Sequence, residues 1–250
     1  SENHKEDQIH LLTTEPYFDL FKKNPHISKV ILDKRLSRLN LIYLYLLMKN
    51  IKKYNFSKVY DLQNSSRTVF YKKILFPKAS KDRWSSTETT IPEGTVKKDF
   101  DKDSVLSRFD YQLKSSGINT NHTLSPDFSW SICDISQIKN YYQLDKYILL
   151  FPFCSPHLTS KKWPYYNELI SLINEKSVNK FKVVIAPGPD EIEEASNINA
   201  LCILDNGKAL DISQLAALIK DSSFVVSNDT GPAHMTAHLG SNGIALFGSH

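Results

Sequence analysis

The clearest structural signal in the sequence is the segment Phe224-Val-Val-Ser-Asn-Asp-Thr-Gly-Pro-Ala-His-Met-Thr-Ala-His-Leu-Gly240. Residues Phe224 to Val226 favour a strand, and Gly231-Pro232 end it and start a helix expected to run to Leu239. A strand that leads directly into a helix is the building unit of parallel α/β sheets. The free N–H groups and the positive dipole end of such a helix form a site for anions, phosphates in particular.

The side chains at this junction allow two interpretations. Thr230 and His234 can add hydrogen-bond donors to the helix start, and the whole site then suits a nucleotide diphosphate. Alternatively, Asp229 or Thr230 is only an N-cap, and His234 is a packed or solvated residue. Local chemistry leaves these two interpretations about even.

The composition indicates a folded protein with a substantial core. Its 250 residues are 41% hydrophobic and 23% charged, enough for one large domain or two of ordinary size. The three cysteines are widely separated and lack a C-x-x-C spacing, so the sequence predicts neither disulfides nor a zinc or other metal site, and we expect a cytoplasmic protein. The longest apolar run, residues 39 to 48, is shorter than the roughly 20 residues of a membrane span and predicts a buried helix.

Positive charge is concentrated in the first part of the chain. Residues 1 to 145 hold 23 Lys and Arg against 17 Asp and Glu, whereas residues 146 to 250 hold 8 against 10. The clusters Lys34-Arg35-x-x-Arg38, Lys49-x-x-Lys52-Lys53 and Lys72-Lys73 can attract an acidic partner such as phosphorylated lipid, or they are merely solvated helix faces. Binding of nucleic acid is not expected, because no aromatic and basic interleaving is present.

The pattern along the chain predicts alternating strands and helices in two domains, residues 1 to 143 and 144 to 250. Expected strands are 9–13, 29–32, 58–62, 147–151, 181–185, 201–204, 224–226 and 244–247, and expected helices are 16–24, 36–53, 104–116, 135–142, 164–176, 191–198, 214–220 and 232–239. Ser213 is the expected N-cap of residues 214–220. Residues 78 to 103 are polar and predict an exposed insertion or a flexible loop.

Polar groups follow several of these strands, at the edge where parallel sheets bind ligands. Asp61-Leu-Gln-Asn-Ser-Ser-Arg67 follows one strand, although Asn-Ser-Ser is also common in turns. After residues 147 to 151, Ser155 and Thr159 can donate to a pyrophosphate, and Lys161 or Lys162 can neutralise it, unless this loop is simply a basic turn.

Four short stretches of the sequence together resemble glycosyltransferase family 9, the heptosyltransferases. The matches are Asp229-Thr230-Gly231-x-x-His234, Lys161-Lys-Trp-Pro164, the Asp-x-Gln-x-x-x-Arg string from Asp61, and the turn Gly188-Pro-Asp-Glu191. The resemblance implies a GT-B fold of two Rossmann-like domains with mostly parallel sheets, truncated at both ends. It implies catalytic roles for Lys161 and His234, and donor contacts from the set Ser155, Asp190, Glu191, Asp229, Thr230 and Gly231. Asp190 and Glu191 compete for contact with the nucleotide's ribose or base, unless they only favour the dipole of the helix that follows. It places Asp61, Gln63, Arg67 and Arg108 on the acceptor side.

The activity that the resemblance implies is an inverting, metal-independent transfer of a sugar, a heptose, from an ADP-sugar donor to a lipid-linked acidic saccharide of the lipopolysaccharide core. No cofactor is expected. The resemblance also implies peripheral contact with the inner membrane. The family's general base lies in a Gly-Asp loop that this sequence does not contain, so we expect donor binding with transfer slowed by about 10²- to 10⁴-fold. Two alternatives are a nucleotide-sugar epimerase using Asp61 and Glu191, and a non-catalytic module that binds nucleotides or a membrane surface.

Overall fold

The computed structural model describes residues 3–77, 83–86, 103–119, 122–155, 157–177 and 180–248. Its contacts divide the chain into two compact units, Ser1–Pro126 and Asp127–His250. Each unit has apolar clusters of its own, described below. In the part of the chain that the structure describes, no helix is long and apolar enough to cross a bilayer.

The first unit contains two short parallel pairs of strands. Strand β1 (His10–Thr13) pairs with β2 (Lys29–Leu32) across helix α1 (Glu15–Lys22), and β3 (Val59–Tyr60) pairs with β4 (Trp84–Ser85). Helices α2 (Leu41–Lys52), α3 (Ser66–Leu75) and α4 (Val105–Ser115) complete it. Its core joins β2, α2 and α3 through Ile31, Leu44, Leu47, Ile51, Tyr71 and Leu75.

Three features of this unit differ from the expectations. Helix α3 was not predicted, and it begins at a capping box in which Ser65 and Thr68 exchange hydrogen bonds. Of the predicted insertion 78–103, most residues lie outside the described part, but Trp84, Ser85 and Ser86 are buried, because β4 pairs with β3. The apolar run 39–48 is not a wholly buried helix, since one of its faces is exposed.

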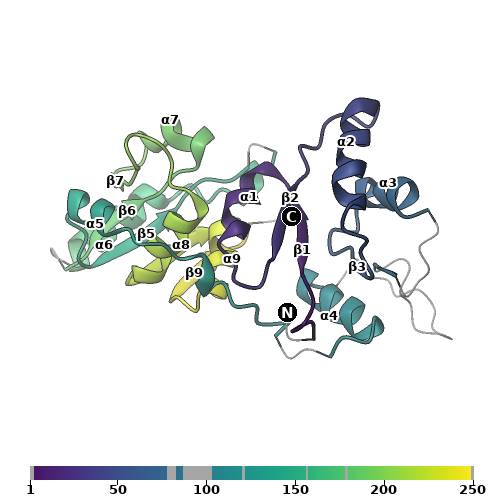
Figure 1. Ribbon diagram of the computed structural model, residues 1–250. Coiled ribbons are helices and arrows are strands. Elements are labelled where there is room, and N and C mark those ends of the chain that lie inside the picture. The colour runs from purple at the N-terminus through teal and green to yellow at the C-terminus, as the bar shows by residue number, and fades with distance from the viewer. Residues whose placement is uncertain are drawn as a thin grey trace. The chain divides into compact units, whose positions relative to one another are not determined.

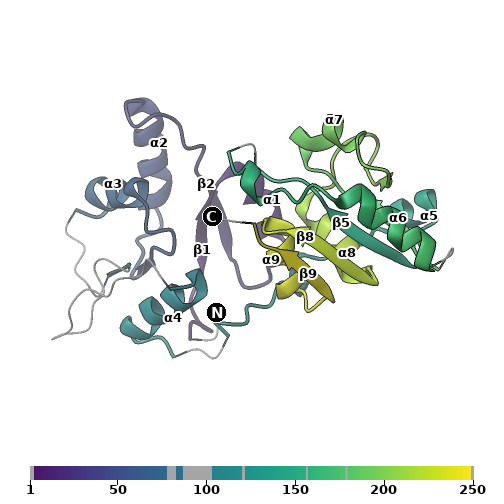
Figure 2. The ribbon, with the colours of Figure 1, turned by 180° about the vertical axis from the view of Figure 1, so that it is seen from behind.

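The second unit is built on a five-stranded parallel sheet (Figures 1 and 2). In chain order its strands are β5 (Tyr147–Phe151), β6 (Lys182–Ile185), β7 (Leu201–Cys202), β8 (Phe224–Asn228) and β9 (Gly243–Leu246), and their order in the sheet is β7-β6-β5-β8-β9. The order reverses between β5 and β8, as in doubly wound nucleotide-binding folds.

Helices cover both faces of this sheet. One apolar cluster joins the sheet to α5 (Ser136–Tyr142) and α8 (Ile212–Asp221). It also includes Leu239, the residue after α9 (Gly231–His238). A second cluster joins the opposite face to α6 (Tyr166–Ser177) and α7 (Ile192–Ala195). Leu149 and Leu150 are neighbours in β5 and belong to different clusters, because alternate side chains point to opposite faces. The sheet is therefore a buried middle layer, which agrees with the apolar run predicted for β5.

Several boundaries in this unit differ from the predicted ones. The unit begins at Asp127 instead of residue 144, because Ile135, Ile138 and Leu144 pack into the sheet's core. The predicted helix 191–198 is a 3-10 turn, η3 (Pro189–Glu191), followed by the short α7. Helix α8 is capped by Asp211, whose carboxylate accepts from the backbone N–H of Gln214, and the expected cap Ser213 is buried inside the helix.

Candidate functional site

The strongest candidate site lies in the second unit, where β5 and β8 end side by side. In the register of the sheet, Phe151 lies opposite Ser227, so the loops after both strands start at the same edge. This edge is the point at which the strand order reverses, and ligands of open α/β sheets bind in the crevice formed there. The loop after β5 carries Lys161, and the loop after β8 carries Asp229.

Asn228 holds these two loops together. Its fully buried side chain donates from Nδ2 to the carbonyl oxygens of Pro152 and Phe153, at 2.9 and 3.3 Å. Its Oδ1 accepts from the backbone N–H of Trp163 and from the Tyr166 hydroxyl, both at 3.2 Å. One amide thus fixes the end of β8 against the start and the end of the loop that carries Lys161.

Lys161 and Asp229 form an ion pair at the mouth of this edge. Lys161 belongs to the 3-10 turn η2 (Thr159–Lys161), and its Nζ lies 2.5 Å from Oδ2 of Asp229. The side chains are only 18% and 14% exposed. His234, 72% exposed on α9, has its Nε2 3.9 Å from Oδ1 of the same carboxylate. The structure therefore brings Lys161, Asp229 and His234 together, as the resemblance implies.

The start of α9 adds backbone donors to this group. Thr230 is the N-cap residue, but its hydroxyl donates to the carbonyl of Asn228 and does not cap the helix. The alternative in which Thr230 is only a side-chain N-cap is therefore wrong. Because no side chain caps the helix, its first turn presents N–H groups next to Lys161 and His234, which suits an anion.

The remaining predicted donor residues lie at the same edge with different surroundings. Ser155 is exposed in the loop after β5, and Asp190 is exposed in the loop after β6. Glu191 is instead occupied: its Oε2 accepts from the backbone N–H of Gly188 at 2.7 Å. Of the two acids that compete for the nucleotide's ribose or base, Asp190 is thus the one not used in a capping bond.

In the first unit, Asp61 anchors a buried polar network at the end of β3. Its carboxylate accepts from the backbone N–H groups of Gln63 and Asn64, and the buried Gln112 of α4 donates to its carbonyl oxygen at 3.0 Å. Gln112 also donates to the carbonyl of Ser85, which ties β3, β4 and α4 together. Gln63 itself is exposed.

A pocket of about 220 Å³ opens beside Asp61. It combines polar groups, two lysines and aromatic rings, and its lining includes Asp61, Asn64, Lys72, Lys73, Phe76 and Trp84. Neither lysine forms an ion pair within the described residues. The pocket therefore offers hydrogen-bonding groups, positive charge and a flat apolar wall in one place.

The two arginines predicted for the acceptor side lie in other surroundings. Arg67 donates to the Tyr71 hydroxyl at 2.7 Å and to the Leu36 carbonyl, and its Nε lies 3.6 Å from Asp33. Arg108 is half-buried on α4, and its Nε has no hydrogen-bond partner in the described structure. No interaction seen among the described residues joins either arginine to Asp61.

Asp33 is the centre of a polar cluster that the sequence did not predict. It is 5% exposed after β2, and the hydroxyls of Tyr43 and Tyr71 both donate to its carboxylate. Burial and the bond to Asp33 raise the pKa of Tyr43, and burial, partly offset by Arg67, raises that of Tyr71. Both hydroxyls thus stay protonated donors at neutral pH. One feature of the sequence could have indicated Asp33: it is an acidic residue directly after a strand. Asn228 has a similar indication, because it is a polar residue at the end of an apolar strand.

Comparison with known proteins decides the family. A family model described as glycosyltransferase family 9 (heptosyltransferase) matches residues 44–250. The chain belongs to glycosyltransferase family 9. A comparison with curated proteins found no match.

Solved structures agree on the fold of this family 9 protein. Escherichia coli heptosyltransferase WaaC, solved with ADP-2-deoxy-2-fluoro heptose, gives a TM-score of 0.67 at 15% identity, over 98% of this chain and 80% of WaaC. E. coli ADP-heptose LPS heptosyltransferase II gives 0.67 at 16% identity, over 98% and 77% of the two chains. A family 9 protein from Veillonella parvula gives 0.68 at 15% identity, over 96% and 80%. The fold is thus the α/β, GT-B type with parallel sheets.

Proposed function

We propose that this protein transfers a heptose from an ADP-sugar donor to a lipid-linked acidic saccharide of the lipopolysaccharide core, with inversion and without a metal ion. The observation that carries the proposal is the partly buried Lys161–Asp229 pair beside the uncapped start of α9, at the edge where the strand order reverses. Membership of family 9 and the nucleotide-sugar ligand in the WaaC structure support it.

In this proposal the second unit holds the donor. The diphosphate lies against the first turn of α9, with Lys161 as a point charge, His234 as a further donor and Thr230 contributing its backbone N–H. Asp190 follows the second strand of the unit, β6, where nucleotide-binding folds place the acid that binds a ribose. Gly231 also supports the assignment, because a Cβ there would meet nothing within 4 Å. The protein's own packing does not require a glycine at that position, whereas close approach of a ligand to the backbone would.

The groups around Lys161 suit the leaving group of the reaction. The acceptor oxygen attacks the anomeric carbon opposite the diphosphate, and the bond from that carbon to the diphosphate oxygen breaks. The acceptor's proton passes to water, because this sequence does not contain the family's Gly-Asp loop, and we therefore expect slow transfer. Negative charge then grows on the diphosphate as the sugar becomes oxocarbenium-like. Lys161 and the N–H groups of α9 are held in place before the reaction, and with the nearby His234 they stabilise that charge electrostatically.

The pocket beside Asp61 is the acceptor's place in this proposal. Asp61 and Asn64 can bind sugar hydroxyls, Trp84 and Phe76 can stack on an apolar sugar face, and Lys72 and Lys73 can pair with acidic groups. Gln63, Arg67 and Arg108 are retained as outer acceptor contacts from the resemblance. Asp33 and Gln112 hold the surrounding elements in place.

Calorimetry with ADP and UDP tests the donor site. We expect ADP to bind more tightly than UDP, and Lys161→Met to weaken ADP binding by about tenfold or more, since a charge-assisted contact contributes roughly 1.5–3 kcal/mol. Lys176→Met, at the exposed end of α6, is the control and should leave ADP affinity unchanged. Absence of ADP binding at millimolar concentration, or equal affinity in Lys161→Met, would contradict the assignment.

An assay of sugar transfer tests the reaction itself. The protein is incubated with ADP-heptose and a heptose-deficient lipopolysaccharide acceptor, and ADP release and product mass are followed. Acceptor-dependent ADP release with a mass increase of one heptose supports the proposal. Interconversion of the free nucleotide sugar without acceptor would favour an epimerase, and binding without either reaction would favour a non-catalytic module.

A further inference from the structure

Helix α2 exposes an unusual number of large apolar side chains. Five residues at its start form what we call the apolar ridge: Leu39, Leu41, Ile42, Tyr45 and Leu46, which are 88%, 74%, 76%, 58% and 57% exposed. The opposite face of the helix is buried through Leu44, Leu47 and Ile51, so α2 is anchored in the unit while the ridge faces outward. Single exposed apolar residues are ordinary, but a contiguous exposed group marks an interaction surface.

The same helix face changes from apolar to basic along its length. Residues 41, 42, 45 and 46 lie on one side of a helix with 3.6 residues per turn, and Lys49, Lys52 and Lys53 continue that side. At 1.5 Å per residue, Lys49 lies about 12 Å further along the helix axis than Leu41. The three lysines are exposed, and their long side chains can reach charged groups beside whatever covers the ridge.

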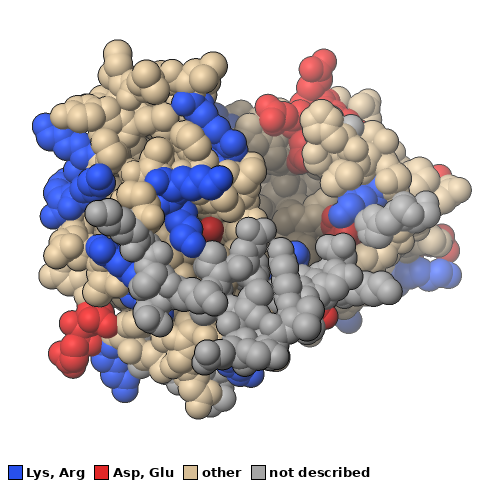
Figure 3. All heavy atoms as spheres, turned by 90° about the vertical axis from the view of Figure 1, so that its right-hand side faces the viewer, with Lys and Arg blue, Asp and Glu red and all other residues tan. Residues whose placement is uncertain are grey.

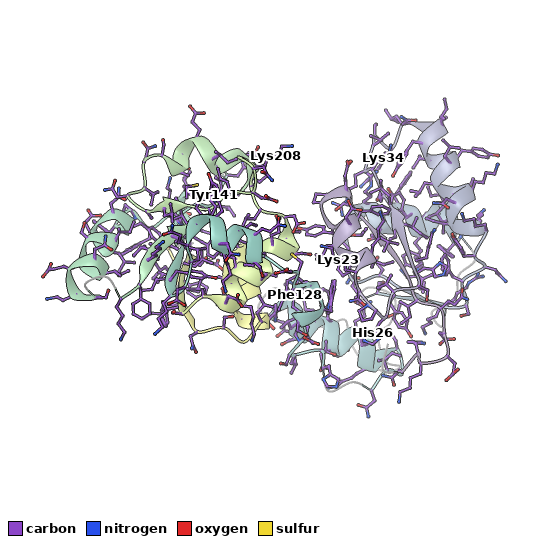
Figure 4. The ribbon with its side chains drawn as sticks, turned by 60° about the vertical axis from the view of Figure 1, so that its left-hand side comes forward. Lys23, His26, Lys34, Phe128, Tyr141 and Lys208 are labelled. Carbon is purple, nitrogen blue, oxygen red and sulfur yellow. The ribbon has the colours of Figure 1, made fainter. Side chains whose placement is uncertain are left out.

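The surrounding sequence carries positive charge only. Between Lys34 and Lys58 there is no Asp or Glu, whereas seven residues are basic: Lys34, Arg35, Arg38, Lys49, Lys52, Lys53 and Lys58. Lys34, in the loop between β2 and α2, is labelled in Figure 4. Figure 3 faces the side of Figure 1 on which α2 is labelled, and its left part shows blue Lys and Arg side chains bordering uncharged, tan surface.

We propose that the apolar ridge inserts into the headgroup region of a bilayer that contains anionic lipid, with the flanking basic residues bound to its phosphates. Apolar side chains beside Lys and Arg on one helix face are the pattern of helices that lie in a membrane interface. A second copy of the chain is a poorer occupant, because it would bring two wholly basic surfaces together. Nucleic acid would account for the charge but not for the ridge. The proposal does not depend on the identity of the sugar donor.

Sedimentation with vesicles tests the proposal. The protein is mixed with vesicles of phosphatidylcholine alone or of phosphatidylcholine with the anionic lipid phosphatidylglycerol, and the bound fraction is measured. We expect binding to the anionic vesicles that weakens with salt. Lys49→Gln with Lys52→Gln should lower the partition coefficient about 25-fold, at about fivefold per lysine. Ile42→Ser with Leu46→Ser should lower it about tenfold or more.

Matched control variants are available on α6. Leu172 is 53% exposed there, so Leu172→Ser with Lys176→Gln changes the same residue types on a different helix and should leave vesicle binding unchanged. The ridge side chains are exposed, so the α2 variants should keep the Tm of the parent protein. A separate Tyr45→Trp variant reports insertion directly: its emission should shift to the blue and be quenched by lipids with brominated acyl chains.

Three results would overturn the proposal. One is no binding to anionic vesicles. Another is binding that Ile42→Ser with Leu46→Ser leaves intact while Tyr45→Trp emission stays unshifted, since only charge would then act. The third is a dimer in sedimentation velocity without vesicles that the same double variant abolishes, which would assign the ridge to a second copy of the chain.

Discussion

At the scale of single residues, Asn228 is the contact on which the donor site depends most. Asn228→Leu keeps the side-chain volume but removes four hydrogen bonds. Two buried carbonyls, the Trp163 N–H and the Tyr166 hydroxyl lose this partner. We expect the free energy of unfolding to fall by roughly 2–4 kcal/mol, with ADP affinity falling too because the Lys161 loop loosens. Urea denaturation and calorimetry measure the two effects.

The control for this substitution is Asn167→Ala. Asn167 also bridges backbone groups, the carbonyl of Asn197 and the N–H of Asn199, but both bonds lie at the surface. Its loss should cost at most about 1 kcal/mol and leave ADP binding intact. Equal costs for both variants would mean that burial does not distinguish Asn228.

The Asp33 cluster gives a second prediction at this scale. Tyr71→Phe removes a hydroxyl that donates to Asp33 and accepts from Arg67, in a side chain that is 3% exposed. Because the buried carboxylate loses a donor, we expect a loss of about 1–3 kcal/mol in the free energy of unfolding. Thermal denaturation measures it against Tyr141→Phe, whose hydroxyl is on an exposed side chain. No difference between the two variants would show that Tyr43 and Arg67 alone satisfy Asp33.

Residue types at loop positions could be predicted from the sequence, but their partners only in part. The resemblance predicts a common site for Lys161, Asp229 and His234, and the three side chains do lie together. Asn228 sits one position before the motif and was passed over, because nothing local shows that its amide reaches residues 76 positions earlier. Asp190 and Glu191 are equal candidates for the nucleotide contact in the sequence, but in the structure the Glu191 carboxylate accepts from the N–H of Gly188 in its own turn. The hydrogen-bond partner of a side chain depends on distances in the folded protein, and the spacing of residues along the sequence does not give those distances.

At the scale of elements, the N-cap of α8 offers a direct test. Asp211→Ala removes the carboxylate that accepts from the Gln214 N–H at 2.8 Å in a capping box. We expect a loss of about 1 kcal/mol in the free energy of unfolding. The change should shift the urea midpoint without changing the slope of the transition. Glu175→Ala, on the exposed end of α6, should stay within about 0.5 kcal/mol of the parent; a similar loss there would contradict the cap assignment.

Strands with a buried apolar run could be predicted from the sequence better than a two-residue strand or the buried face of a helix. The strands Lys29–Leu32 and Tyr147–Phe151 occur as predicted, because their apolar runs are buried on both faces. The two-residue strand β4 lies in a polar stretch without any strand signal, and only its pairing with β3 buries Trp84. Residues 39–48 are apolar on almost every side, so the sequence alone could not show which face of α2 the core leaves exposed.

At the scale of the whole molecule, the division into units follows the cores and not the change in composition. The predicted boundary at residue 143 was set by the first strongly apolar strand of the second series. The structure instead gives η1 (Ser129–Ser131) and α5 to the second unit, because they cover the face of the sheet that α8 also covers. Which segments cover a face of the sheet is decided only when the sheet and its helices pack together, so the composition of residues 127–143 does not show it.

Because the two units have separate cores, we expect residues 127–250 to bind ADP without the first unit. Lys161, Asp229, His234, the start of α9 and Asp190 all belong to the second unit, which has a five-stranded sheet with its own two clusters. We expect the separate unit to show cooperative thermal unfolding and an ADP affinity within about threefold of the whole chain, a difference of roughly 0.7 kcal/mol. It should not bind anionic vesicles, because the apolar ridge lies in the first unit. Cooperative unfolding without ADP binding would mean that residues of the first unit complete the donor site, whereas vesicle binding by the separate unit would move the membrane surface away from α2.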